Sequence, residues 1–159
     1  MDSLPRIDPL FIAWLAGFID GEGCFHIARM TAHRKTDGQA YFNYSPMLVI
    51  SNTDRQPLDE IVATLALGRV QAQRTNGQHV KWKGSFQLHA RGPQAQAIAL
   101  LTLPYLRIKR PQAQALIDFP VLARNPNQWN PIPPETQAER ERLYATIRTL
   151  NAKGPAIEK

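Results

Sequence analysis

The chain has 159 residues, of which 43% are hydrophobic and 20% charged, and this length and composition fit a single globular domain with a buried core. Its one cysteine, Cys24, excludes an internal disulfide framework and a thiolate zinc site, and its apolar runs are too short to span a membrane. The net charge of +6 favours a polyanionic partner, with nucleic acid as the first choice.

The first predicted element is a helix that begins at Asp8-Pro9, because Asp8 can cap free N–H groups and Pro9 fits the first helical position. Its apolar residues recur at helical spacing and predict a buried face of Phe11, Trp14, Leu15 and Phe18. A row of small residues, which would let another backbone come close, consists of Ala13, Gly17 and Gly21. Gly21 and Gly23 end the helix around Glu22, whose negative charge is unfavourable there unless a positive charge such as a metal ion compensates it.

Alternating apolar and polar residues predict four strands, over residues 24–33, 41–50, 69–74 and 79–90. Residues 75–78, Thr-Asn-Gly-Gln, carry the strongest hairpin signal in the chain. Pro46 lies inside the second strand and indicates a sheet edge or a bulge. Two hairpins separated by a helix predict one antiparallel sheet with helices packed on one face.

Four further helices are expected, over residues 53–67 or 57–67, from Pro93 to before Pro104, from Pro111 to near Pro120, and over 135–151. Gly68 is expected to end the first of them. The order is αββαββα with extra C-terminal helices, an α+β fold. We expect residues 1–159 to form one domain, with a core over about 8–122 and a helical extension over about 123–152.

The sheet face turned away from the helices is predicted to be basic and rich in amides. Its polar residues are His26, Asn43, Ser45, Arg69, Gln71, Gln73, Lys81, Lys83, Ser85, Gln87 and His89. An ordinary solvated face carries charges of both signs, whereas this one has no Asp or Glu, which favours nucleic acid. Gln, Asn and Arg also read base edges in a major groove, where a two-stranded ribbon fits.

Residues 15–23 read L-A-G-F-I-D-G-E-G, and this string resembles the motif of the LAGLIDADG homing endonucleases. The order of elements over nearly the whole chain resembles the single-motif branch of that family. The resemblance implies a homodimer whose motif helices pack together across a two-fold axis, with each sheet in the major groove of a long, roughly palindromic DNA site. It implies cleavage of both strands with a divalent metal, leaving 3′ overhangs.

Carried over by position, the resemblance makes Glu22 the metal-binding acid, where the family usually has Asp, with the Gly21 carbonyl as a further ligand. It makes Asn52, or Ser51 in a shifted register, the residue that positions water. It makes Lys109 the basic residue that stabilises charge on the phosphate, with Arg55 as a weaker second candidate. Asp20 receives a structural role. The dimer contact implied by the motif consists of Ala13, Ala16, Gly17 and Gly21.

The set of expected DNA contacts comprises the polar face together with three neighbouring positions, Ala28, Met30 and Arg34. Mg²⁺ is the expected cofactor, with Mn²⁺ or Ca²⁺ able to replace it for binding. Rival hypotheses are an RNA maturase or a cleavage-inactive DNA-binding regulator on the same fold, and a protein-interaction domain. An intracellular protein is expected, and the composition, poor in Lys and rich in Ala, Gln and Arg, favours the cytoplasm of a prokaryote or phage, with an organelle as the alternative.

Overall fold

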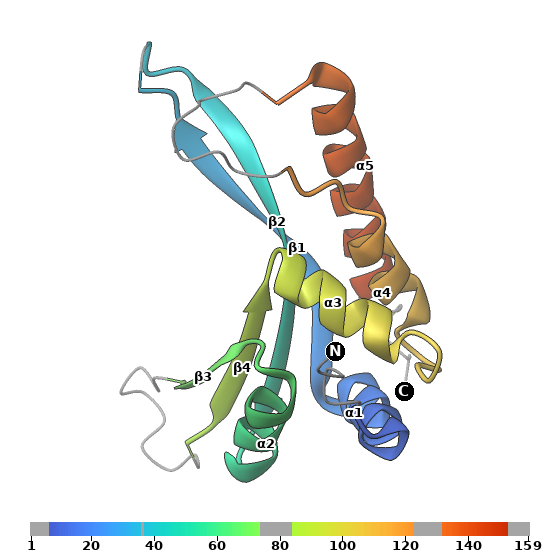
Figure 1. Ribbon diagram of the computed structural model, residues 1–159. Helices are drawn as coiled ribbons and strands as arrows, with labels where there is room; N and C mark the ends of the chain where they lie inside the picture. The colour runs from blue at the N-terminus through green and yellow to red at the C-terminus, as the bar shows by residue number, and fades with distance from the viewer. Residues whose placement is uncertain (1–6, 36, 74–83, 123–131, 153–159) are drawn as a thin grey trace, which may run out of the picture.

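The computed structural model describes residues 7–35, 37–73, 84–122 and 132–152. Five helices and four strands follow one another in the order α1 Pro9–Glu22, β1 Gly23–His33, β2 Ala40–Asn52, α2 Gln56–Leu65, β3 Arg69–Ala72, β4 Phe86–Arg91, α3 Pro93–Thr102, α4 Arg110–Ile117 and α5 Pro134–Asn151. The expected αββαββα order with extra C-terminal helices is confirmed (Figure 1). The turn at 75–78 and the first part of the fourth strand, with Lys81 and Lys83, lie outside the described residues.

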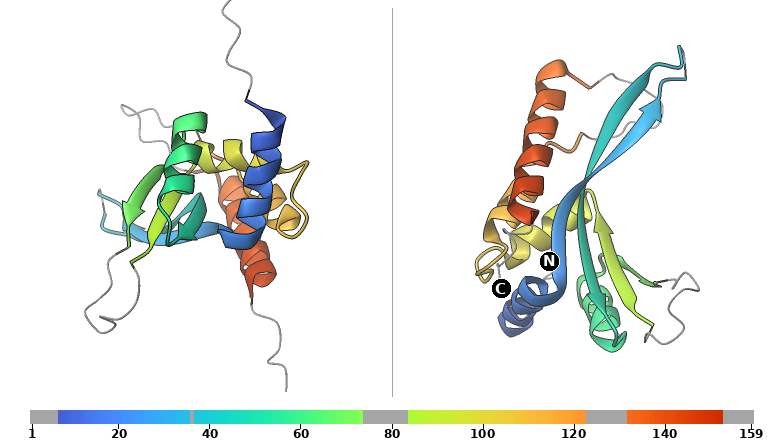
Figure 2. Two further views of the ribbon diagram at one scale, coloured as in Figure 1. Left: turned by 90° about the horizontal axis from the view of Figure 1, so that it is seen from below. Right: turned by 180° about the vertical axis from the view of Figure 1, so that it is seen from behind.

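The strands form one antiparallel sheet in the order β1-β2-β4-β3. β1 and β2 make a long twisted hairpin that extends well beyond β3 and β4 (Figures 1 and 2). Pro46 introduces no bulge, because the β1–β2 register runs without a break from Gly23↔Ile50 to His33↔Ala40. Pro46 lies just beyond the end of the β2–β4 pairing at Met47, where its carbonyl accepts the Gly92 N–H at 2.8 Å and no ladder hydrogen bond to β4 needs the N–H that proline lacks.

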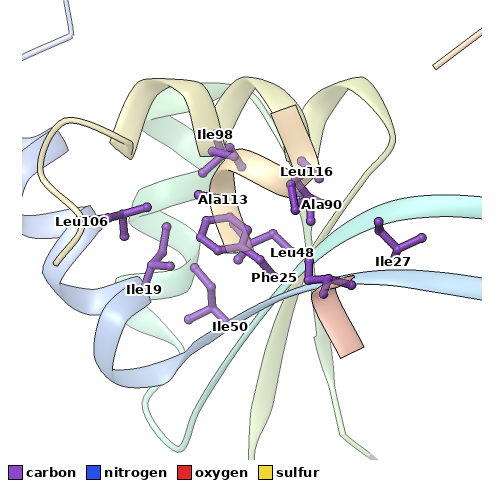
Figure 3. Packing of buried hydrophobic residues seen from close by; sticks show 14 of the residues in the cluster. Ile19, Phe25, Ile27, Leu48, Ile50, Ala90, Ile98, Leu106, Ala113 and Leu116 are labelled. Atoms are coloured by element: carbon purple, nitrogen blue, oxygen red, sulfur yellow. The ribbon is translucent and has the colours of Figure 1, made fainter. Parts of the chain in front are cut away.

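Apolar side chains alternate along the strands as predicted, and they build the core against the helices. Figure 3 shows Phe25, Leu48 and Ile50 from the sheet packed toward Ile19 of α1 and Ile98 of α3, all of them fully buried. Helices α1, α2 and α3 cover the wide part of the sheet, and α5 follows the outer part of the β1–β2 hairpin (Figure 1). The opposite face is left to polar side chains.

α5 is attached to the hairpin by aromatic and cationic side chains. Tyr144 packs on Tyr44 with ring centroids 5.3 Å apart. The central carbon of the Arg29 guanidinium lies 4.5 Å from the centroid of the Phe42 ring and 5.1 Å from that of Tyr144. Gln137 donates to the Phe42 carbonyl at 2.9 Å. Such contacts stiffen a two-stranded ribbon that would be marginal by itself.

Three predicted details, two of helices and one of a strand, are wrong. α2 begins at Gln56 and ends at Leu65, because Ala66 takes the left-handed conformation (φ 52°) two residues before the expected stop at Gly68. Trp14 is 40% exposed, although it was expected on the buried face of α1, which consists of Leu15, Ala16 and Ile19. Strand β3 ends at Ala72 rather than at residue 74.

Gly23 joins α1 to β1 directly, and a side chain would not fit there. A Cβ atom at this position would lie 2.9 Å from the Ile19 carbonyl oxygen and 3.0 Å from the Ile19 Cα, both backbone atoms that cannot turn aside. We therefore expect Gly23→Ala to lower the free energy of unfolding by about 1–3 kcal/mol, measured by chemical denaturation. Cys24→Ala, one residue further on at an exposed position, is the control and should change it by less than about 0.5 kcal/mol. Equal stability of the two variants would contradict the close packing.

Candidate active site

Glu22 is the last residue of α1 and its side chain is exposed. Among the described residues it takes part in no hydrogen bond or ion pair, so its carboxylate is free to bind a ligand. The neighbouring Gly21 carbonyl is likewise outside the hydrogen bonds formed by the described residues at this helix end. The two predicted metal ligands are therefore adjacent and accessible at one point of the surface.

Asp20, two residues earlier, is engaged on the other side of the helix. Its carboxylate accepts the backbone N–H groups of Arg107 at 2.8 Å, Ile108 at 3.2 Å and Lys109 at 2.9 Å. Burial raises the pKa of this carboxyl group, but the three backbone hydrogen bonds and the nearby Lys109 charge outweigh burial and lower it. The carboxylate therefore holds the segment between α3 and α4 against the end of α1, which agrees with the structural role expected for it.

Lys109 lies at the same helix end. Its ammonium group donates to the carbonyl oxygens of Ile19 at 2.8 Å and Asp20 at 2.7 Å, of which the first also accepts the Gly23 N–H and the second has no partner within the helix. The charge also reaches Cys24, whose thiol pKa is raised by burial and lowered to a lesser degree by Lys109. A lysine thus supplies positive charge at the end of α1, so the placement of Glu22 does not by itself require a metal.

The two candidates for positioning water differ in where they point. Asn52 pairs with Phe86 on the helix side of the sheet, and its Oδ1 accepts the Asp54 N–H at 2.8 Å in a local turn. Ser51 lies on the polar face, where it accepts a hydrogen bond from Gln87 at 3.1 Å. The side-chain oxygen of Asn52 is therefore already engaged by the Asp54 N–H. Of the two residues, Ser51 is the one on the sheet face that is predicted to contact DNA.

Arg55, the weaker basic candidate, is turned toward α2 and β4. Its guanidinium pairs with Asp59 at 3.0 Å and lies 5.8 Å from the centre of the Phe86 ring. Both partners of the ion pair are more than half exposed, so the contact contributes little to stability. Nothing in this arrangement brings Arg55 to the end of α1.

The polar face, defined here as the sheet face opposite the helices, gathers most of the predicted DNA contacts. Sheet register aligns His26 with Met47 and Arg91, and aligns His89 with Val49 and Arg69. The other predicted contacts on this face are Ala28, Met30, Asn43, Ser45, Gln71, Gln73, Ser85 and Gln87. Arg34 lies in the turn of the long hairpin, 3.4 Å from Asp37. Within the described part of the chain the polar face carries no acid.

Two residues of the polar face escaped sequence analysis. Arg91 extends β4 by one residue beyond the predicted strand end and pairs with Met47. Tyr41, 38% exposed, shares the face with Asn43. Continuing the two-residue alternation by one step in each strand would have identified both.

The histidines of the polar face are held in their neutral form. Burial lowers the pKa of His26, against a smaller opposing effect of a backbone hydrogen bond. Burial also lowers the pKa of His89, and the nearby charges of Arg91 and His26 add to the effect. His89 Nε2 lies 3.1 Å from Gln87 Oε1, a contact that the Nε2-protonated tautomer of a neutral ring would make as a hydrogen-bond donor. These rings can therefore offer hydrogen bonds but add little positive charge at neutral pH.

The face of small residues on α1 is open except at one position. Gly17 and Gly21 are exposed, and an added Cβ at either would meet no atom within 4 Å. Ala16 is fully buried in the core of its own chain, so the prediction that it contributes to a dimer contact is wrong. Ala13, Gly17 and Gly21 remain as the small-residue face. Its neighbours are aromatic, with the Trp14 ring 5.3 Å from that of Phe18.

The donors present at Glu22 fit a hard divalent cation only as part of a ligand set. A carboxylate and a backbone carbonyl are oxygen ligands of the kind that Mg²⁺ prefers, but Mg²⁺ requires six. Among the described residues no group of three His, Cys, Asp or Glu side chains gathers into a metal site. The remaining ligands would have to come from water, phosphate or a second copy of the chain. A cleft of about 490 Å³ lined by Asp8, Phe11, Trp14 and Glu60 lies at the opposite end of α1.

Comparison with known proteins agrees with this arrangement. A profile of the LAGLIDADG endonuclease family matches residues 15–90, and no curated protein matches the chain. The homing endonuclease I-CvuI, in complex with the I-CreI target DNA, is 25% identical, with a TM-score of 0.62, and the match covers 93% of this chain and 87% of that one.

Two more distant structures share the fold. The archaeal intron-encoded homing endonuclease I-Vdi141I, complexed with DNA, is 13% identical with a TM-score of 0.63, covering 94% of this chain and 89% of that one. The meganuclease I-SmaMI, bound to uncleavable DNA, is 17% identical with a TM-score of 0.62, and this chain, 97% covered, spans 47% of it. Among the described residues, no helix is both long and apolar enough to cross a bilayer. Residues 15–90, which carry the motif, match the LAGLIDADG endonuclease family, and the fold of the chain is that of the LAGLIDADG homing endonucleases.

Proposed function

We propose that the protein is a site-specific endonuclease that cuts both strands of double-stranded DNA with a divalent cation, leaving 3′ overhangs. The observation that carries the proposal is the position of Glu22, exposed at the end of α1, where β1 of the acid-free polar face begins. A basic sheet attracts a phosphate backbone, and an unpaired carboxylate beside it repels that backbone unless a cation lies between them.

Each site residue has a definite task in this proposal. Glu22 and the Gly21 carbonyl would hold the cation, which supplies Lewis-acid polarisation of the phosphodiester when bound. Lys109 has two N–H groups bonded to helix carbonyls, and its third can donate to a phosphate oxygen that gains charge. Ser51, or the amide nitrogen of Asn52, would orient the attacking water. The choice of Mg²⁺ is supported by I-CvuI, whose DNA complexes were obtained in the presence of 2 mM Mg or 2 mM Ca.

The acting unit in this proposal is a homodimer joined through α1. One chain offers a single carboxylate at the site, whereas cutting two strands requires two such sites. Gly17 and Gly21 leave open space on α1 into which the same helix of a second copy can pack. Two-fold symmetry would then place two sheets along the groove of a roughly palindromic site.

The first test of the proposal is Glu22→Gln, which keeps the shape of the side chain and removes its charge. We expect the cleavage rate to fall about 100-fold or more, because the cation loses its charged ligand, while affinity for the uncut target stays within about threefold. The target is found by incubating wild-type protein with a randomised duplex library and Mg²⁺ and sequencing the cut ends. Glu60→Gln, an exposed acid of α2, is the matched control and should cut normally.

Two outcomes of this experiment would contradict the proposal. Wild-type cleavage by Glu22→Gln would remove Glu22 from the metal site. Failure of wild-type protein to cut any sequence, together with tight binding to a folded intron RNA, would favour the maturase function over the nuclease.

The second test concerns the dimer. Gly17→Leu fills the open space on α1 and should prevent close approach of two helices, so we expect wild-type protein to sediment at twice the 17.9 kDa chain mass and the variant as a monomer. Cleavage should be lost with the dimer. Ala97→Leu adds the same bulk at an exposed position of α3 and should leave the dimer intact. A dimeric Gly17→Leu variant would show that the chains associate through another surface.

A further inference from the structure

Asp20 and Lys109 lie far apart in the sequence and form two hydrogen bonds with each other. Each residue is the side-chain partner in one bond and the backbone partner in the other. The Asp20 carboxylate accepts the backbone N–H of Lys109 at 2.9 Å, and the Lys109 ammonium returns to the backbone carbonyl of Asp20 at 2.7 Å. A further bond from the ammonium to the Ile19 carbonyl, at 2.8 Å, fixes the direction of the side chain. The ammonium group is thereby tied to the end of α1, the same helix end that carries Glu22.

The segment 107–109 owes its position to Asp20. Three successive backbone N–H groups, of Arg107, Ile108 and Lys109, converge on one carboxylate. Arg107 and Ile108 are exposed, and the Ile108 side chain is 70% exposed, so apolar burial of their side chains does little to hold the segment. Charge-assisted hydrogen bonds to a carboxylate are the strong kind, and here they hold the start of α4 together with the buried Leu106 and the Lys109 side chain.

We infer that Asp20 is a positioning residue for the reaction, which acts by setting the place of the Lys109 ammonium relative to Glu22. This inference rests on the proposed function, in which Lys109 meets the phosphate. Because the Asp20 oxygens are turned to the connecting segment and bonded there, Asp20 does not act as a second metal ligand. The two acids of the motif therefore divide the work, Asp20 placing the cationic group and Glu22 holding the metal.

The experiment uses Asp20→Asn, with Asp20→Ser as a second variant that lacks the amide donor. Asparagine replaces one acceptor oxygen by an NH₂ group that would face the N–H donors of 107–109. The matched control is Gln96→Met: Gln96 holds the other end of α4, donating to the carbonyls of Leu116 at 2.9 Å and Phe119 at 2.7 Å. The Gln96→Met substitution removes these hydrogen bonds and loosens α4 at its C-terminal end, away from Lys109.

The first readout needs no catalysis. Wild-type and variant proteins without DNA are treated with an amine-acylating reagent, and modification of Lys109 is measured by peptide mass spectrometry against the exposed Lys35 as internal reference. We expect both Asp20 variants to raise the relative rate at Lys109 about tenfold, because the segment 107–109 loses its carboxylate partner and moves the ammonium away from the Ile19 and Asp20 carbonyls. Gln96→Met should leave that rate unchanged while lowering the melting temperature.

The second readout is single-turnover cleavage of the selected target with Mg²⁺, alongside binding of the uncut target with Ca²⁺. We expect the Asp20 variants to cut about 100-fold more slowly, as for a misplaced catalytic group, with affinity within about threefold of wild type. Lys109→Met should be at least as impaired as the Asp20 variants.

Four results would overturn the inference. Unchanged acylation of Lys109 in the Asp20 variants would show that Asp20 does not hold it. The same acylation and cleavage changes in Gln96→Met would reduce the effect to general loosening of α4. If Lys109 is acylated faster in the Asp20 variants but these still cut normally, while Lys109→Met is inactive, then the reaction does not need Asp20 to position Lys109. Normal cleavage by Lys109→Met would remove the role proposed for Lys109 and this inference with it, leaving the Glu22 test unaffected.

Discussion

The direct passage from α1 into β1 is the constraint on which the rest of the structure depends. The helix ends at Glu22 and the strand begins at Gly23, with no loop between them. Such a joint needs a glycine in contact with the last helical turn, where the Gly23 N–H donates to the Ile19 carbonyl and the Asp20 carbonyl is left to a donor from elsewhere. Lys109 donates to both carbonyls, and in doing so brings the start of α4 to the place where the sheet begins.

Helical geometry explains why two acids so close in sequence differ in surroundings. Successive residues of an α-helix are turned by about 100°, so that Asp20 and Glu22 point about 200° apart. The Asp20 carboxylate points at the segment 107–109 and accepts its backbone N–H groups. Glu22 faces away and has no partner among the described residues. The end of α1 cannot move by one residue along the sequence, because only a glycine fits at position 23, and the two acids therefore keep their separate roles.

The periodic features of the fold could be predicted from the sequence, because two-residue and helical repeats reflect local geometry. The sheet faces and the order of elements belong to this class. The end of α2 could not be predicted in this way. Ala66 adopts the left-handed conformation that ends the helix, while Gly68 packs closely on β4, where a Cβ would lie 3.1 Å from Leu88 Cδ2. The pairing of Asp20 with Lys109 was equally inaccessible, because spacing along the chain carries no information about contacts between segments 89 residues apart.

The register of β2 shows the same limit at the scale of one residue. A resemblance in sequence selects Asn52 as the polar residue after the strand, but the fold turns Asn52 to the helix side and Ser51 to the polar face. A one-residue step exchanges the faces of every side chain in a strand, so only the pairing with β4 decides between them. Ser51 is bonded to Gln87, and Gln87 to His89, so that a continuous polar row leads from the end of β2 into the sheet. In the proposed nuclease, this row would connect the water-positioning residue at the end of β2 with the side chains that face the DNA.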